Sequence, residues 1–248
     1  MKKIFYLTLA LTLALTACKK DKEEEDSEII IPSGDGLIAN AVKDVDGNTY
    51  NAVKLGKQIW MSQNLRTKRY SDGTTIPNVR YPNNSDLTMG TFGLLYDWVA
   101  TVDGYVGSNH NPSGIQGVCP KGWHVPSDSE WTELTDYLKN KSLYLCNDNV
   151  LNIAKALASQ NGWSEYSYNE CAVTHHTTNN NTSGFNAMPA GSYYNNTPEG
   201  FGREAIFWSS YENASDKAIV RTIISDNATV IRDNKYKSRY NSVRCIMD

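Results

Sequence analysis

The spacing of hydrophobic positions changes along this 248-residue chain and outlines three kinds of segment. A short apolar run at residues 4–17 is followed by a strongly polar run at residues 19–28. Alternating apolar and polar positions then predict strands over 38–45, 49–55 and 58–64. The body of the chain is therefore expected to open with a three-stranded meander.

Glycine-containing dipeptides connect these strands. Asp46-Gly47 favours a type I′ hairpin turn, and Gly56-Lys57 favours a type II′ turn with the glycine leading. The run from Asp44 to Asn48 resembles the start of a calcium loop. It lacks the remaining spacing and the terminal glutamate of an EF-hand, so a hairpin turn is the better interpretation.

Helical periodicity is clear in one place and weaker in a second. Ser127 and Glu130 match a capping box, in which the serine caps the third helical amide and the glutamate reaches back. Apolar positions 131, 134 and 138 then share one face, which predicts an amphipathic helix packed on a core. A second helix is expected from Val150 to Gln160, ended by Gly162 in the left-handed conformation.

The last third of the chain alternates polar segments with short apolar ones. Residues 166–182 are rich in Asn and Thr and are interpreted as a surface loop. Short strands are expected at 205–210, 218–225, 229–232 and 241–247. Strands, then two helices, then further strands indicate an α+β fold with mostly antiparallel short strands.

The N-terminal apolar run is predicted to be a lipoprotein signal peptide over residues 1–17. It is shorter than the ~20 residues that a membrane span requires, and it follows Lys2 and Lys3. Leu15-Thr16-Ala17-Cys18 matches a lipobox, so cleavage would leave Cys18 to be lipidated with more than one acyl chain, as stable anchoring needs. The alternative is an ordinary secretory signal with an incidental cysteine.

Residues 18–37 are predicted to form an acidic, flexible tether, because a run of charges buries no apolar surface. Its acidic part resembles the export signal that directs many Bacteroidetes lipoproteins to the outer leaflet of the outer membrane. We therefore expect a lipid anchor in the outer membrane, with a single domain over residues 38–248 exposed at the cell surface. With 24 basic and 27 acidic side chains, the sequence offers no basic stripe, so no nucleic-acid partner is expected.

Four cysteines remain once Cys18 is lipidated, and an exported protein is expected to pair them. Four cysteines allow three pairings, which the sequence alone does not decide. We favour the nested arrangement Cys119–Cys245 and Cys146–Cys171. The competing idea is a zinc site of Cys171 with the adjacent histidines 175 and 176. Adjacent side chains of an extended segment point to opposite faces, so this site is disfavoured and no metal or cofactor is expected.

Motifs spread along the domain resemble one family, the Fibrobacter succinogenes major paralogous domain. The matching segments are 44–50 (DVDGNTY), 56–61 (GKQIWM), 64–65 (NL), 72–73 (DG), 95–98 (LYDW), 119–131 (CPKGWHVPSDSEW), 183–191 (SGFNAMPAG), 207–210 (FWSS) and 242–245 (SVRC). The resemblance implies a fold similar to the C-type-lectin-like superfamily. It also implies that Cys119 pairs with Cys245.

The same superfamily contains formylglycine-generating oxidases, so an enzyme of that kind is one hypothesis. Only Cys245 occurs near the C-terminus, where those enzymes carry a reactive cysteine pair, and no Ser/His/Asp arrangement appears. Calcium-dependent lectins use Trp-Asn-Asp and Glu-Pro-Asn motifs, whereas this chain has Trp208-Ser209-Ser210 at the corresponding strand. No catalytic residue is therefore assigned.

The favoured hypothesis is a surface-anchored, non-catalytic recognition or adhesion lipoprotein whose partner is a glycan or a surface protein. Its alternative is a structural subunit of a surface assembly. Tyr193, Tyr194 and Tyr211 are the candidate ligand-binding residues, because tyrosine combines stacking area with a hydroxyl. The segment from Gly191 to Asn196 is expected to be a loop that exposes at least one ring, although a strand there would bury one tyrosine and both rings could cover the edge of the core.

Overall fold

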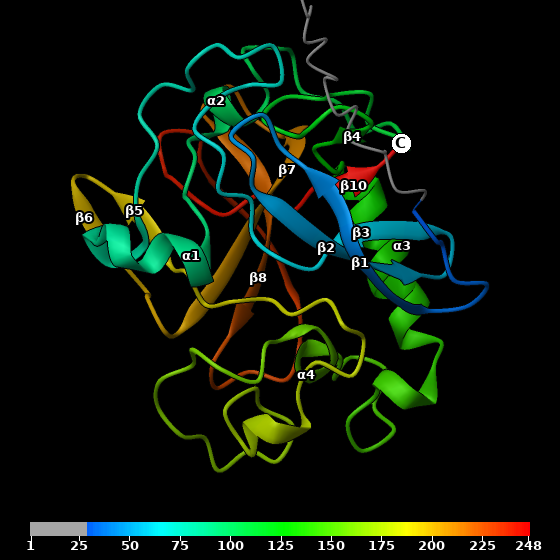
Figure 1. Ribbon diagram of the computed structural model, residues 1–248. Coiled ribbons are helices and arrows are strands. Elements are labelled where there is room, and N and C mark those ends of the chain that lie inside the picture. The colour runs from blue at the N-terminus through cyan, green and yellow to red at the C-terminus, as the bar shows by residue number, and fades with distance from the viewer. Residues whose placement is uncertain (1–28) are drawn as a thin grey trace, which may run out of the picture.

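The computed structural model describes residues 29–248; the predicted signal peptide, Cys18 and the charge run at 19–28 lie outside the described residues. Strands β1 (Gly36–Lys43), β2 (Thr49–Leu55) and β3 (Gln58–Met61) form the predicted antiparallel meander. The C-terminal strand β10 (Ile246–Met247) adds to β3 and pairs in turn with β4 (Trp123–His124). The sheet therefore has the order β1-β2-β3-β10-β4 (Figure 1).

The two predicted turns of the meander differ in outcome. Gly56 has a φ of 63°, as a tight turn led by glycine requires. The type I′ turn at Asp46-Gly47 is wrong, because only Gly47 has a positive φ and its N–H donates to the Asp44 carbonyl. The Asp44 carboxylate accepts from the N–H groups of Asp46 and Asn48, at 3.0 and 2.9 Å, and so favours a longer loop.

A second antiparallel sheet contains β7 (Glu204–Glu212), β8 (Lys217–Ile224) and β9 (Ile231–Tyr236) in that order. The first two strands agree with the predicted segments. The third begins later than predicted, because its register with β8 starts at the pair Thr222 and Ile231. Residues 241–247 form no continuous strand: residues 241 and 242 make isolated bridges to Tyr96 and Phe207, and only β10 is regular.

Helix α3 (Asp128–Lys139) joins the two sheets, and its predicted capping box is confirmed. The Trp131 ring lies 4.6 Å from the Trp60 ring of β3 and 5.6 Å from the Phe207 ring of β7, measured between centroids. The apolar face of α3 thus packs between the two sheets. Figure 1 shows the helix behind β1 to β3.

The second predicted helix is largely wrong, since only α4 (Ala154–Leu157) forms, as a single turn. Val150 is exposed because it lies within a tight turn, which the Asn152 N–H closes by donating to the Asn149 carbonyl. Ala158 leaves the helix to bridge Ala187. The remaining helical segments are also short: α1 (Met89–Phe92), α2 (Trp98–Thr101), η1 (Pro82–Asn84), η2 (Asp86–Thr88), η3 (Ser142–Tyr144) and η4 (Thr177–Asn179).

Both disulfides of the nested arrangement are present, Cys119–Cys245 and Cys146–Cys171. The first ties the segment before β4 to the last strand. The second holds the loop at 166–182 against the segment that precedes α4. This loop is not entirely on the surface as expected, because residues 171–174 are buried.

The described part of the chain has an α+β fold, with helices and antiparallel sheets as predicted. Its last predicted tether residues contact the domain, since the Asp35 carboxylate accepts hydrogen bonds from the Gly56 N–H and from the hydroxyls of Tyr137 and Tyr144. Among residues 29–248, no helix has the length and apolar character needed to cross a membrane.

Candidate functional site

The predicted tyrosine loop is instead a hairpin of β5 (Ser192–Tyr194) and β6 (Thr197–Glu199). Asn195 and Asn196 both have positive φ angles, 48° and 60°, which suits the two-residue turn between these strands. Strand alternation then separates the two candidate rings. Tyr193 is only 8% exposed, whereas Tyr194 is half-buried at the surface.

Tyr193 contributes to a small core at the base of this hairpin. Its ring meets Tyr240 edge-on at 6.1 Å, and the two backbones exchange hydrogen bonds of 3.0 and 2.9 Å. The Arg80 guanidinium lies 5.3 Å from the Tyr193 ring and 4.9 Å from the Tyr240 ring. Burial raises the pKa of Tyr240.

Tyr194 belongs to a layered surface cluster, here called the tyrosine–arginine patch: Tyr194, Tyr236, Arg239 and Lys217. The Tyr194 and Tyr236 rings stack at 6.2 Å with an interplanar angle of 7°. Arg239 lies 4.2 Å from the centre of the Tyr194 ring, and Lys217 lies 4.8 Å from that of Tyr236. Arg239 is also held by Glu199 at 2.5 Å. The patch presents aromatic edges, hydroxyls and cations in a fixed arrangement, with Tyr236 43% exposed.

Tyr211, the third predicted binding residue, does not join the patch. No ring contact links it to Tyr194 or Tyr236 in the part of the chain that the structure describes, and its backbone N–H donates to the Ser209 hydroxyl at 3.3 Å. The sequence prediction missed Tyr236, Tyr240 and the basic residues around them. A signal was present in residues 235–240 (KYKSRY), where cations and tyrosines alternate.

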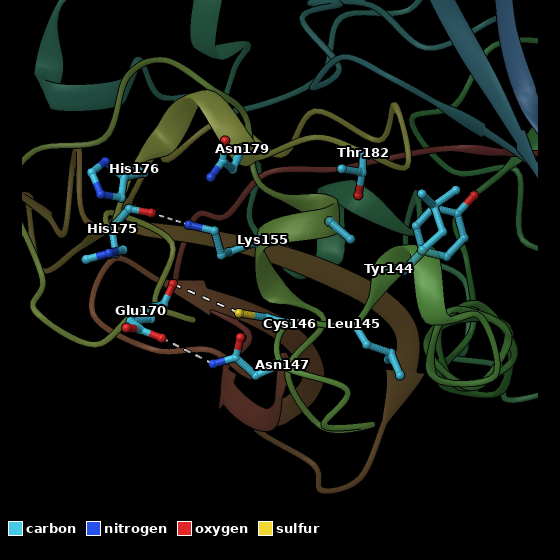
Figure 2. A pocket seen from close by; sticks show the side chains of 12 residues that line it. Tyr144, Leu145, Cys146, Asn147, Lys155, Glu170, His175, His176, Asn179 and Thr182 are labelled. Atoms are coloured by element: carbon cyan, nitrogen blue, oxygen red, sulfur yellow. Dashed lines mark hydrogen bonds between the residues drawn. The ribbon is translucent and has the colours of Figure 1, made fainter.

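A second candidate site is a pocket of about 400 Å³ beside the Cys146–Cys171 disulfide (Figure 2). One wall is the segment 143–147, the other is the segment 175–182, and α4 forms the floor. Figure 1 shows α4 and its neighbouring loops at the opposite end of the molecule from the C-terminus. The pocket lining is mixed. Its apolar residues include Leu143, Leu145 and Ala156, and its polar side chains include Asn147, Glu170, His176, Asn179 and Thr182.

Lys155 of α4 lies in the middle of this pocket and is only 9% exposed. Its ammonium donates to the carbonyls of Ala172 (3.2 Å) and His175. No carboxylate of residues 29–248 lies within ion-pair distance of it. Burial lowers the pKa of Lys155. The sequence signal was a single lysine within the otherwise apolar run at residues 153–158.

The zinc alternative is excluded at Cys171, which is disulfide-bonded and offers no thiolate. The geometric reason given for the histidines is wrong, however. Their rings lie 4.4 Å apart rather than on opposite faces, because His176 has a φ of 52° and the backbone is not extended there. Residues 29–248 contain no group of three His, Cys, Asp or Glu side chains placed to hold a metal ion.

These features define a two-disulfide α+β domain with an aromatic surface patch and a pocket around a buried lysine. The model of the Fibrobacter succinogenes major domain matches residues 53–247, so the chain belongs to this family. The comparisons with curated proteins and with solved structures gave no match.

Proposed function

We propose that the chain is a lipid-anchored, non-catalytic recognition or adhesion protein of the outer membrane that acts at the cell surface. The lipobox at Cys18 and the acidic run after it support this location. Two disulfides within the domain suit an oxidising compartment. The antiparallel α+β fold and the Cys119–Cys245 bond support kinship with C-type-lectin-like domains.

The tyrosine–arginine patch carries the proposal. Tyrosine and arginine are enriched where proteins bind partners, because each offers a large contact area and directed hydrogen bonds. The stacking of Tyr194 on Tyr236, with Arg239 and Lys217 over the rings, fixes these side chains before a ligand arrives. A pre-ordered surface loses less conformational entropy on binding, so a glycan or a surface protein is the expected partner.

An oxidase related to the formylglycine-generating enzymes has less support. Every cysteine within residues 29–248 is disulfide-bonded, which leaves no free thiol there for such chemistry. His124, the most buried histidine, is held on both ring nitrogens by Glu130 and Asp248 at 2.7 and 2.6 Å. This arrangement makes it a structural link between β4, α3 and the C-terminus.

The test uses the full-length chain on intact cells, probed by cross-linking pull-down and by a glycan array. Tyr194→Ala with Tyr236→Ala should weaken capture of the partner at least tenfold, since truncation of aromatic anchors commonly weakens binding by that much. Tyr168→Ala is the control, because this ring is 91% exposed and lies outside the patch.

Unchanged capture by a folded double variant would remove the patch from consideration. Capture of a fixed set of proteins at constant stoichiometry, with no ligand on the array, would instead favour the structural-subunit alternative. Surface location is checked in the same cells by protease accessibility of the domain.

A further inference from the structure

Lys155 places a buried positive charge in its pocket, and no carboxylate of residues 29–248 pairs with it directly. An ammonium has three N–H donors, and two of those of Lys155 go to the carbonyls of Ala172 and His175. The third N–H of Lys155 has no partner within residues 29–248, and Lys155 is one of the residues that line the pocket. A buried ammonium is expensive without a counter-charge, so an anion entering the pocket would find a ready partner.

The charge balance of the pocket limits what that anion can be. Glu170 lines the same pocket and is within 3.4 Å of the Asn147 amide. The two carbonyls that hold Lys155 add further negative potential. Lys155 can pair with one negative charge of a ligand, whereas Glu170 and the two carbonyls oppose a second, so a monoanion is favoured over a dianion such as hydrogen phosphate.

The polar part of the lining suits a polyhydroxylated molecule. Asn147, His176, Asn179 and Thr182 can donate or accept hydrogen bonds, and the volume of about 400 Å³ is within the range of small-molecule sites. Figure 2 shows these side chains on both sides of Lys155 rather than on one wall. A ligand with one carboxylate and several hydroxyls would use both features.

We propose that this pocket binds a small acidic sugar, a hexuronate, with Lys155 as the counter-charge of its carboxylate. The inference does not rest on the tyrosine–arginine patch, and either site can fail without the other. It assigns to the domain a second, small-ligand site.

The direct test titrates the purified disulfide-bonded chain with D-galacturonate at neutral pH, followed by NMR. We expect saturable shifts at residues of the pocket and binding at least tenfold tighter than that of D-galactose, which lacks the carboxylate. Equal binding of the two sugars, or no saturable binding of galacturonate, would overturn the proposal. Tighter binding of inorganic phosphate would overturn the assignment of a singly charged ligand.

Lys155→Met should weaken galacturonate binding at least tenfold. The matched control is Lys54→Met, because Lys54 also donates to backbone carbonyls, those of Pro32 and Ser33, but lies outside the pocket. Lys54→Met should leave the affinity unchanged. Retention of full affinity by Lys155→Met would overturn the proposal.

A readout on the wild-type chain removes any dependence on the folding of the variant. Because a bound carboxylate stabilises the ammonium, galacturonate should raise the pKa of Lys155, observed through its side-chain 13Cε resonance. Glu170, His175 and His176 also line the pocket, so their titrations must be followed in the same experiment. A pKa of Lys155 that does not move at saturating galacturonate would contradict the proposed contact.

Discussion

Arg221 and Lys155 are both buried cations, but the first has a carboxylate partner and the second has backbone carbonyls. Arg221, with its side chain 5% exposed, lies 2.5 Å from the Asp128 carboxylate at the start of α3. Arg232 completes the group by binding the same carboxylate at 2.8 Å. Lys155 donates only to the carbonyls of Ala172 and His175 among the described residues.

The contrast extends to the surroundings of each cation. Near α3, His124 also has carboxylate partners: Glu130 contacts one ring nitrogen and Asp248 contacts the other. Around Lys155 the neighbouring segments are loops, joined by the Cys146–Cys171 disulfide and short turns. One region is therefore held together by compensated charge, and the other by a covalent bond and backbone contacts.

The two cations therefore differ in their expected roles: Arg221 stabilises the fold, whereas Lys155 is a candidate ligand-binding residue. A buried cation that already has a carboxylate partner gains nothing from an external anion. Removing that carboxylate leaves the cation buried with its full desolvation penalty. An uncompensated cation in a pocket contributes less to stability but has affinity left for a ligand. Stability measurements on both regions therefore test the distinction.

The largest effect is expected for Asp128→Asn. Burial alone would raise the pKa of Asp128, but Arg232 and Arg221 outweigh it and hold this pKa below its usual value. The carboxylate is thus ionised and stabilises the fold above pH ~3.9, with the contribution lost as the pH falls. Replacement leaves Arg221 buried without a counter-charge and should lower the free energy of unfolding by about 3 kcal/mol in urea denaturation.

Asp136→Asn is the matched control on the same helix. Its partner Lys139 lies 3.0 Å away, but both side chains are substantially exposed. Such a surface pair should contribute no more than about 0.5 kcal/mol. Equal losses for the two variants would show that burial does not distinguish them.

A smaller effect is expected for Lys155→Met. The two carbonyls lose a donor, but the protein is also relieved of a desolvated charge, so the loss should be about 1 kcal/mol. Urea denaturation under the same conditions allows direct comparison with Asp128→Asn. A loss as large as that of Asp128→Asn would mean that Lys155 contributes as much to the stability of the fold as the charges near α3 do.

The features predicted correctly have either a local cause or a counterpart in the family resemblance. The capping box of α3 depends on residues three apart, and the turn at Gly56 depends on one glycine. The meander follows from alternation within each strand, and the pairing of Cys119 with Cys245 followed from the family resemblance. These signals act over a few residues or through a family pattern, so they can be read along the sequence.

The features missed depend on contacts between distant segments. β10 inserts between β3 and β4, although nearly the whole domain separates it from β3 in the sequence. The apolar run at 153–158 looks helical, but only one turn forms because Ala154 and Ala158 bond to other segments. The tyrosine–arginine patch likewise combines β5 with residues 217, 236 and 239. No local spacing specifies such partners.

The smallest of the three stability effects is expected at His124, and it should depend on pH. Burial opposes protonation of His124, but Glu130 and Asp248 outweigh it and raise the pKa of its imidazole. A raised pKa in the folded state makes the stabilisation complete below the unfolded value of ~6.5, and the stabilisation is lost as the pH rises through the folded value. The stability of the wild type relative to His124→Gln should therefore be greatest in mild acid and decline towards alkaline pH, as measured by urea denaturation across that range.

The effect is limited because the Asp248 side chain is 60% exposed and water screens its charge. His110→Gln is the control, since His110 is exposed and should leave the pH profile unchanged. A pH-independent difference between the wild type and His124→Gln would show that the imidazole is held by hydrogen bonds alone, and that charge compensation near α3 stops at Asp128.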